Sequence, residues 1–297
     1  MGPVELGKLR IHKIFELDSG VPMPVALPGV TSADLARLKR WHDDPLEFAA
    51  TPEESQMIFG VHSWLIEVDG LNILIDTCDG NHKNRSIADV HQLDTRYLDG
   101  FSAIGIAPEQ IDMVLCTHLH FDHVGWNTHK VDGKWVPTFP NARYLFARKE
   151  YDYWQELRSH DDHGLHDVRH LFDCIDPIVE AGLADLIETD HCVSPELWIE
   201  PSHGHTPGHV HFCIESADER GVITGDLMHH PIQCAMPHRP ATFDMDPEAG
   251  RATRMAFVDK HRDSGTMVIG AHFADPTAGW IKSYPDGTRF CGVGLED

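Results

Sequence analysis

The sequence predicts an α/β protein in which helices cover the faces of β-sheet. Strand-like and helix-like segments alternate along its central part, and this alternation places helices against a sheet. A second observation is that several apolar runs of strand length end in a polar residue. In open α/β layers, binding sites form beyond strand ends, so these polar residues can converge although they lie far apart in the chain.

Residues 1–55 are expected to form an N-terminal arm that packs on the main domain, residues 56–297, or on a partner subunit. Residues 8–15 alternate like a strand, and residues 31–41 can form a short capped helix. The segment is too short and too rich in proline to form its own core. Regular structure is expected to be interrupted at Gly20, Pro22, Pro24 and Pro28.

The main domain is expected to begin with a hairpin, because residues 61–68 and 71–76 resemble strands and flank the turn dipeptide Asp69-Gly70. A helix over residues 93–104 then leads into a strand over residues 111–116. The other expected elements are strands over residues 142–146, 197–200, 210–214, 221–225 and 266–271, and helices over residues 148–157 and 246–263.

The charge balance is strongly acidic, with 24 Lys and Arg against 47 Asp and Glu and a formal net charge of −23. Such a chain repels phosphate backbones and anionic lipids, which argues against nucleic acid or membrane partners and favours a small-molecule partner. The sequence shows neither a stretch long enough to span a bilayer nor a secretory signal pattern, so we expect a cytoplasmic protein. The seven cysteines contain no Cys-x-x-Cys pair and are expected to be reduced, mostly buried, and not needed as ligands.

The strongest chemical signal is the sequence THLHFDH at residues 117–123, directly after an apolar strand. His118 and His120 point to the same side if the strand geometry continues, because strand side chains alternate. Asp122 and His123 follow where the chain turns and can aim at a second point nearby. Imidazole and carboxylate ligands suit zinc, iron, manganese or cobalt.

The chain has 23 His, so four such positions coincide by chance with a probability of roughly 1–2%. Later strand-end residues lower that risk, since three further candidate ligands each follow a predicted strand. Asp76 also ends a strand, where it can either orient a ligand or open a turn. The His-rich segment of residues 159–170 is interpreted as an acidic surface loop and left out of the site. The three later candidates are His209, Asp226 and His272.

This set resembles the binuclear metallo-β-lactamase superfamily over about residues 60–280. The string GHTPGH at residues 204–209, the Gly-Asp at 225–226 and the Ala-His at 271–272 are similar to that family's pattern. The resemblance implies a four-layer αββα sandwich of two mixed sheets with helices on the outer faces. It assigns one metal to His118, His120 and His209, the other to Asp122, His123 and His272, and a bridging role to Asp226.

Within residues 203–209, the resemblance places the ligand at the last His, so His203 and His205 are expected to be structural or to support a ligand. Asp76 matches a carboxylate that orients a ligating His, and Thr206 is expected to support the site from behind. Two divalent ions roughly 3.5–4 Å apart would share a water or hydroxide that attacks the substrate at neutral pH. Zinc is the first expectation for both ions, with Mn²⁺, Co²⁺ or Fe²⁺ as alternatives.

The segments at residues 120–127 and 225–229, with the N-terminal arm, look most like the quorum-quenching lactonase and methyl-parathion-hydrolase branch, which implies a homodimer. A metal-bridging hydroxide would attack the carbonyl of a neutral lactone or ester, first an N-acyl-homoserine lactone. The alternative is an aryl ester or organophosphate triester. The lactonases often place a Tyr three residues after the bridging Asp. Here that residue is His229, which can polarise the carbonyl, protonate the leaving group, or simply border the pocket. Asp122 and His229 are the candidate catalytic residues.

Two other function classes are weaker. An iron-dependent oxidoreductase on the same fold would use a one-iron site or a flavin domain, and the sequence shows neither. A non-catalytic protein that keeps a metal for stability would not need the complete ligand set. Substrate walls are expected from the arm, Phe121 and Trp126, although both aromatic residues can equally be core.

Overall fold

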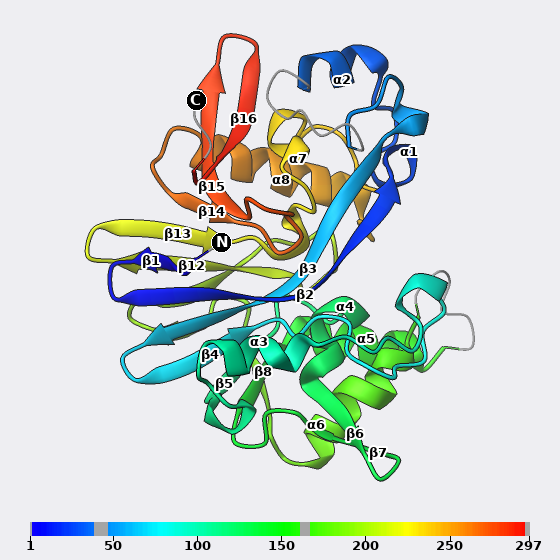
Figure 1. Ribbon diagram of the computed structural model, residues 1–297, viewed down its shortest axis with the longest axis vertical. Helices are drawn as coiled ribbons and strands as arrows, with labels where there is room; N and C mark the ends of the chain where they lie inside the picture. The colour runs from blue at the N-terminus through cyan, green and yellow to red at the C-terminus, as the bar shows by residue number, and fades with distance from the viewer. Residues whose placement is uncertain (1, 39–46, 161–166, 295–297) are drawn as a thin grey trace.

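The computed structural model describes residues 2–38, 47–160 and 167–294. Two seven-stranded sheets face each other, and helices lie on their outer sides (Figure 1). The first sheet has the order β1 (Val4–Leu6), β2 (Leu9–Pro22), β3 (Gln56–Val68), β4 (Leu71–Ile75), β5 (Met113–Leu115), β8 (Arg143–Ala147), β9 (Ala184–Ile187). The second has the order β10 (Cys192–Ser194), β11 (Leu197–Pro201), β12 (Val210–Ser216), β13 (Glu219–Ile223), β14 (Met267–Ile269), β15 (Ala278–Tyr284), β16 (Gly287–Gly292).

Both sheets are mixed. Strands β4, β5, β8 and β9 run parallel, and so do β13 and β14, while the other neighbours in the two sheets pair antiparallel. A separate hairpin joins β6 (Thr128–Val131) and β7 (Lys134–Pro137). The helices are α1 (Met23–Ala26), α2 (Ser32–Leu38), α3 (Tyr97–Ala103), α4 (Phe121–Val124), α5 (Arg148–Arg158), α6 (Asp176–Glu180), α7 (Ile232–Ala235) and α8 (Pro247–His261).

Strand periodicity explains the four layers. Ile73 and Ile75 of β4 point into the core between the sheets, where they join Phe212 of the second sheet. Leu74 points to the opposite face and packs with Phe101 of α3. Alternate residues of one strand thus bury into two different cores, because strand side chains alternate in direction. The predicted αββα sandwich is confirmed.

The predicted hairpin is present, with Asp69 and Gly70 at φ values of 48° and 82° in its turn. The two central positions of a type I′ turn require positive φ, which Asp and Gly tolerate. Helix α8 begins as expected, because the Asp246 carboxylate accepts the backbone N–H of Ala249 at 3.0 Å. The strands β1, β6, β7, β9, β10, β15 and β16 were not predicted.

The N-terminal segment is only partly an arm. Strand β2 pairs with β3 from Arg10 to Pro22, so residues 4–22 are strands of the first sheet. Strand β1 pairs only with Leu9–Ile11, which leaves the remainder of β2 as an edge strand. Gly20 therefore lies within β2 without ending it, whereas Pro22 is the last residue of the strand, at an edge position where proline is tolerated.

Residues 23–38 and 47–55 fit the expected arm better. Leu27 and Leu35 are buried in a separate apolar cluster with Ile232 and Met236, so the arm packs on the region of α7. Helix α2 is fixed at its start by hydrogen bonds between Thr31 and Asp34. The last part of the helix expected over residues 31–41 lies outside the described residues.

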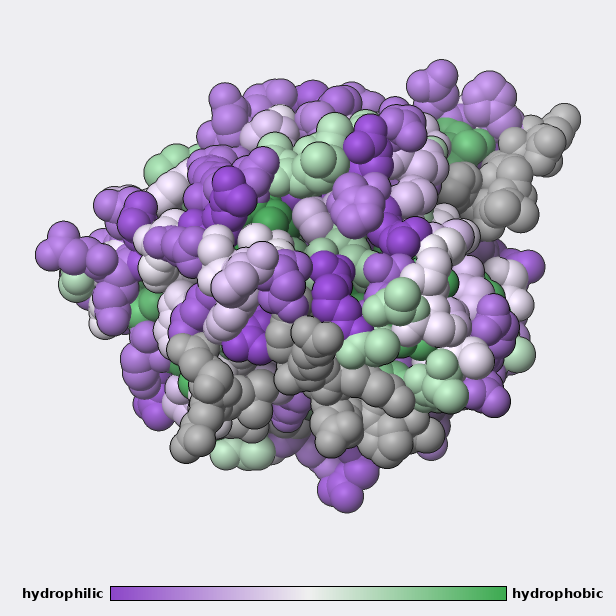
Figure 2. All heavy atoms as spheres, turned by 90° about the horizontal axis from the view of Figure 1, so that it is seen from above, coloured by the Kyte–Doolittle hydropathy of each residue, from purple (hydrophilic) through white to green (hydrophobic). Residues whose placement is uncertain are grey.

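The surface agrees with the acidic composition. On the face drawn in Figure 2, hydrophilic residues predominate and hydrophobic ones form small separate patches. In the described ranges of the chain, no helix is both long and apolar enough to cross a membrane.

The turn after β4 packs backbone to backbone on the segment that follows the THLHFDH motif. Gly125 N–H donates to the Cys78 carbonyl at 2.7 Å, and Trp126 N–H donates to the Thr77 carbonyl at 2.7 Å. A Cβ atom on Gly125 would lie 1.9 Å from the Asp79 carbonyl oxygen. The motif therefore needs glycine at this position for its close approach to the turn.

Replacing Gly125 by Ala should lower the free energy of unfolding by about 3 kcal/mol, because the backbones must move apart. The matched control is Gly133→Ala, where a Cβ meets nothing within 4 Å but φ is +80°. That variant should cost only about 1 kcal/mol for the left-handed conformation. Urea unfolding measures both. Equal costs would contradict the close-approach argument.

Candidate metal centre

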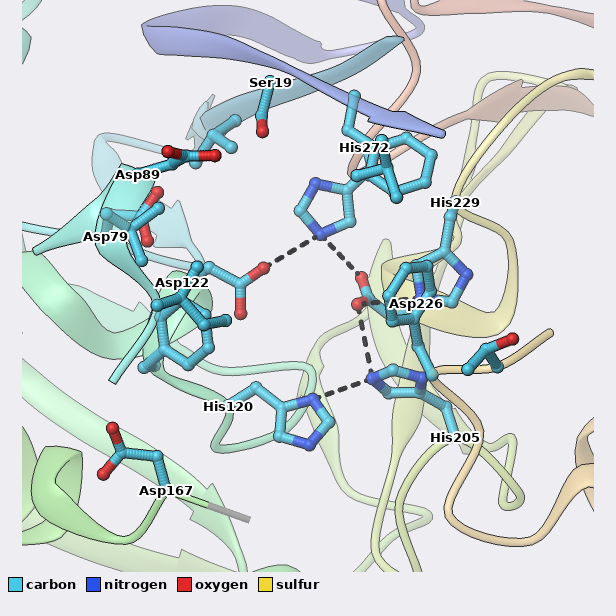
Figure 3. Close-up of a pocket in the computed structure, with 18 of the residues that line it drawn as sticks. Ser19, Asp79, Asp89, His120, Asp122, Asp167, His205, Asp226, His229 and His272 are labelled. Atoms are coloured by element: carbon cyan, nitrogen blue, oxygen red, sulfur yellow. Dashed lines mark hydrogen bonds and ion pairs between the residues drawn. The ribbon is translucent and has the colours of Figure 1, made fainter. Parts of the chain in front are cut away.

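The structure brings the motif and the later strand ends together in two groups of candidate ligands that share Asp226. In each group the ligand atoms lie within 4.8 Å of one another. Figure 3 shows side chains of both groups pointing into one space. The first group is His118, His120, His205 and Asp226, and the second is Asp122, His123, Asp226 and His272.

The two sheets each contribute to this centre. His118 and His120 follow β5 of the first sheet, and α4 then carries Asp122 and His123. Asp226 follows β13 and His272 follows β14 of the second sheet. The side chains meet because both sheets end at the same edge of the sandwich (Figure 1).

The structure places His205, and not the expected His209, in the group with His118 and His120. His120 Nδ1 lies 2.9 Å from His118 Nε2 and 2.8 Å from His205 Nε2, so three ring nitrogens converge on one point. His209 Nε2 instead accepts the backbone N–H of Asp226 at 2.9 Å, and its Nδ1 lies 2.8 Å from Ser202 Oγ. Neither nitrogen of His209 is free to bind a metal.

Asp76 lies directly behind His123, at φ 55° in the turn after β4. Its Oδ2 is 2.8 Å from His123 Nδ1, and its Oδ1 accepts the Thr117 N–H at 2.8 Å. Carboxylate oxygens accept hydrogen bonds, so His123 donates from Nδ1 to Asp76 and directs its Nε2 into the centre. His272 likewise donates from Nδ1 to the Gly60 carbonyl at 3.1 Å, so its Nε2 also faces the centre.

Thr206 does not touch a candidate ligand through its hydroxyl, which donates to Glu150 Oε2 at 2.8 Å. Glu150 also accepts N–H groups from Gly208 at 2.8 Å and from Leu119 at 3.2 Å. This buried carboxylate thus ties the 204–209 loop to the motif. No sequence pattern indicated a role for Glu150, which lies in the first turn of α5.

The buried groups of the centre shift the pKa values of its imidazoles in opposite directions. Burial lowers the pKa of His118 and His120 well below the usual range, and neighbouring imidazoles add to this. Burial would also lower the pKa of His123, but Asp226 and Asp76 raise it well above its usual value. Burial opposes ionisation of Asp226, yet His123 and His272 hold its pKa well below the usual range.

The donor set fits two divalent ions. Imidazole nitrogens and carboxylate oxygens are common ligands of zinc and similar metals. Asp226 Oδ1 is buried and has no hydrogen-bond partner, although a buried carboxylate oxygen normally has one. His205 lies beside Asp226, with Nε2 3.3 Å from Oδ2. A pair of cations at the two groups would satisfy these atoms.

A cavity of about 700 Å³ opens beside the centre. Its apolar wall includes Val21 and Pro22 of β2, so the N-terminal segment lines the cavity as expected. Phe121 also lines it. Trp126 does not, because its ring stacks on Tyr97 at 5.2 Å and its Nε1–H donates to Glu16. Further apolar lining comes from Phe59, Val61, Phe243 and Met245.

His229 lies at the cavity side of the second sheet. Its Nε2 is 3.3 Å from Asp226 Oδ2, and its ring is nearly parallel to that of His272, with centroids 6.0 Å apart. Both ring nitrogens are buried without a hydrogen-bond partner. They are therefore available to a ligand in the cavity.

Two further cavity residues were not foreseen. Asp79 is buried with no partner on either carboxylate oxygen, and burial together with Asp122 and Glu16 raises its pKa. His170 belongs to the His-rich segment for which the sequence predicts a surface loop, yet it is buried in the cavity wall. Its Nδ1 donates to the Asp167 carbonyl at 2.8 Å, and burial lowers its pKa to about 4. His163 and His166 lie outside the described residues.

The comparison with protein families agrees with this geometry. The model of the metallo-beta-lactamase superfamily matches residues 58–269, which is most of the chain. An N-acyl homoserine lactonase of Bacillus sp. is 29% identical over 128 residues, 43% of this chain and 42% of that protein. One from Bacillus cereus is 26% identical over 175 residues, 55% of this chain and 61% of that protein. Both matches span less than two thirds of the relatives' length.

Solved structures share the fold over nearly the whole chain. The hydrolase AbOPH of the beta lactamase superfamily has a TM-score of 0.80 at 21% identity, covering 100% of this chain and 98% of that one. The dizinc quorum-quenching lactonase AidC, in complex with a product N-hexanoyl-L-homoserine, has a TM-score of 0.76 at 18% identity, covering 99% and 98%. At these identities the likeness concerns the fold. With the family match over most of its length and the shared αββα architecture, the chain belongs to the metallo-beta-lactamase superfamily.

Proposed function

We propose that this protein is a hydrolase that uses two divalent metal ions, zinc first, to open a lactone, with N-acyl-homoserine lactones as the first substrate class. The observation that carries the proposal is the pair of ligand groups joined by Asp226 beside a cavity of about 700 Å³. The names of the relatives support the lactone class. A homodimer and a cytoplasmic location stay predictions.

Two ions bound here would supply Lewis acidity and an activated water at neutral pH. The ligating roles are proposed for His118, His120 and His205 on one side, Asp122, His123 and His272 on the other, and Asp226 between them. Asp76 and the Gly60 carbonyl hold the protons of His123 and His272 on Nδ1, so that each Nε2 faces the centre. Asp122 would also orient the attacking water by accepting its hydrogen bond.

His229 is proposed to act on the substrate. Its ring nitrogens make no hydrogen bond, and Nε2 lies 3.3 Å from Asp226 Oδ2, beside the place proposed for the reacting carbonyl. An N–H from this imidazole can donate to the carbonyl oxygen and then to the leaving alkoxide. This is the role that the resemblance gives to a tyrosine.

The cavity favours a neutral substrate. Among the described residues that line it, none is Lys or Arg, whereas Asp79, Asp89 and Asp167 are present. A substrate with a carboxylate or phosphate monoester remote from the reacting group would face these carboxylates without a counter-charge. A neutral lactone with an apolar acyl chain can instead pack on Val21, Pro22 and the aromatic wall.

The alternative substrates are aryl esters and organophosphate triesters. The observation in their favour is the aromatic wall, in which Phe59 and Phe243 pack edge to face at 5.9 Å beside His229. Such a wall suits an aryl leaving group as well as an acyl chain. An iron oxidoreductase or a metal-holding protein without activity is not favoured, because both ligand groups are complete.

His205→Gln should bind one tight metal ion per chain instead of two, because the first group loses a ring nitrogen. The matched control is His209→Gln, in which the new amide oxygen can still accept the Asp226 N–H, and two ions should remain. Native mass spectrometry counts the ions. The opposite pattern would return the ligand role to His209.

His229→Phe should lower kcat by about 10²- to 10⁴-fold, because the substrate oxygen loses a proton donor. KM and the two bound ions should change little. His229→Tyr should recover much of the rate, since a phenol can also donate. Steady-state kinetics with metal counting test this, and a full rate in the Phe variant would rule out a catalytic role.

The metal-loaded protein should open acyl-homoserine lactones with a higher kcat/KM than it shows for an aryl ester or an organophosphate triester. An aryl ester that carries a remote carboxylate should be a poorer substrate than its neutral analogue. A His120→Ala protein is the control for metal dependence. Aryl ester cleavage without any ring opening would move the assignment to the alternative.

A further inference from the structure

A third group of metal-ligand side chains lies away from the candidate metal centre. Glu200 of β11 and His211 of β12 are cross-strand partners, and Cys213 follows two residues later on the same face of β12. Their ligand atoms lie within 4.8 Å of one another. Phe212, between the two β12 residues, points into the core between the sheets, so the group is on the outer face, beneath α8.

The imidazole of His211 is buried but forms no hydrogen bond with any described residue. The side chain is 6% exposed, and neither Nδ1 nor Nε2 has a hydrogen-bond partner. A buried polar group without a partner costs free energy, so such groups are rare. Nε2 is 3.9 Å from Glu200 Oε2 and faces that carboxylate.

We propose that Glu200, His211 and Cys213 form a separate transition-metal site on the outer face of the second sheet, with Zn²⁺ as its first occupant. Carboxylate, imidazole and thiolate are all zinc ligands. Two ligands of one tetrahedral zinc lie about 3.4 Å apart at usual bond lengths, so the 3.9 Å separation needs only a small adjustment. The fourth position is open to water.

His261 of α8 lies near this group and packs on Phe257, the same ring that faces His211. Its ring packs on Phe257 at 4.4 Å, and Phe257 in turn lies 5.9 Å from the His211 ring. Both nitrogens of His261 are also buried without a partner. His261 is therefore the candidate for a fourth ligand in place of water, which would connect α8 to the sheet.

In the structure, the ammonium group of Lys260 is the positive charge beside Glu200. Its Nζ is 2.9 Å from Glu200 Oε2, and its side chain is 55% exposed. An exposed ion pair of this kind contributes little to stability, and the ammonium can move into solvent. The lysine is therefore a competitor for the metal, and its removal should tighten metal binding.

The thiol must lose its proton when the metal binds. Burial raises the pKa of Cys213 to about 12, and Glu200 adds to the effect. Metal binding at this site consequently releases a proton and strengthens as the pH rises. The site is independent of the proposed hydrolase activity, because none of its three ligands belongs to the two groups around Asp226.

Cobalt distinguishes this site from the metal centre, since a thiolate bound to Co²⁺ gives a ligand-to-metal charge-transfer band and neither group around Asp226 contains Cys. The full chain with its two ions in place should develop this band when Co²⁺ is added. Cys213→Ser should abolish it, while Cys192→Ser, which changes an exposed cysteine, should leave it unchanged. Lys260→Ala should lower the cobalt dissociation constant up to about fivefold.

Hydrolytic activity and the thermal unfolding midpoint show that each variant is folded. A band that survives Cys213→Ser, or is absent from both the wild-type and Lys260→Ala proteins, would overturn the proposal. Loss of the band in His211→Gln as well as in Cys213→Ser would support it. Failure of the lactonase assay would leave this result untouched, because the band does not depend on turnover.

Discussion

The buried carboxylate of Asp226 is the constraint on which the rest of the centre depends. A charge taken out of water is costly unless partners surround it, and here the partners are imidazoles from both sheets. To bring them within reach, the ends of β5, β13 and β14 must meet at one edge. The nearest distances from its oxygens are 3.1 Å to His123, 3.2 Å to His272, 3.3 Å to His205, 3.3 Å to His229 and 3.8 Å to His118.

Much of this centre could be predicted because its residues follow strands, and strand ends are visible as apolar runs. The choice between His205 and His209 was not visible. Both residues lie in the segment 204–209, and contacts with distant parts of the chain decide which of them faces the centre. Glu150 fixes the loop by accepting the hydrogen bond of the Thr206 hydroxyl. The backbone N–H of Asp226 donates to Nε2 of His209. Neither of these two contacts can be inferred from the residues around His205 and His209.

The prediction of the fold succeeded where local patterns decide the structure, and it was incomplete where neighbouring elements decide it. The four layers follow from alternating apolar residues, but the role of β2 depends on what lies beside it. Gly20 resembles a strand breaker in the sequence, yet β2 continues through it to Pro22 as an edge strand, because β1 covers only the first part of β2. Likewise, Asp79 and His170 are ordinary polar residues in the sequence, and only the tertiary structure buries them beside the cavity.

The edge position of β2 has an evolutionary consequence. Beyond Ile11 this strand is hydrogen-bonded along one side only, yet Val21 and Pro22 at its far end line the cavity. Substitutions of these residues can reshape the cavity, and the only backbone hydrogen bonds they can disturb in this sheet are those between β2 and β3. The metal ligands lie elsewhere and need not change. Duplicated copies of this gene could therefore diverge in which substrates the cavity accepts through this short stretch, while the metal-dependent hydrolysis is inherited intact.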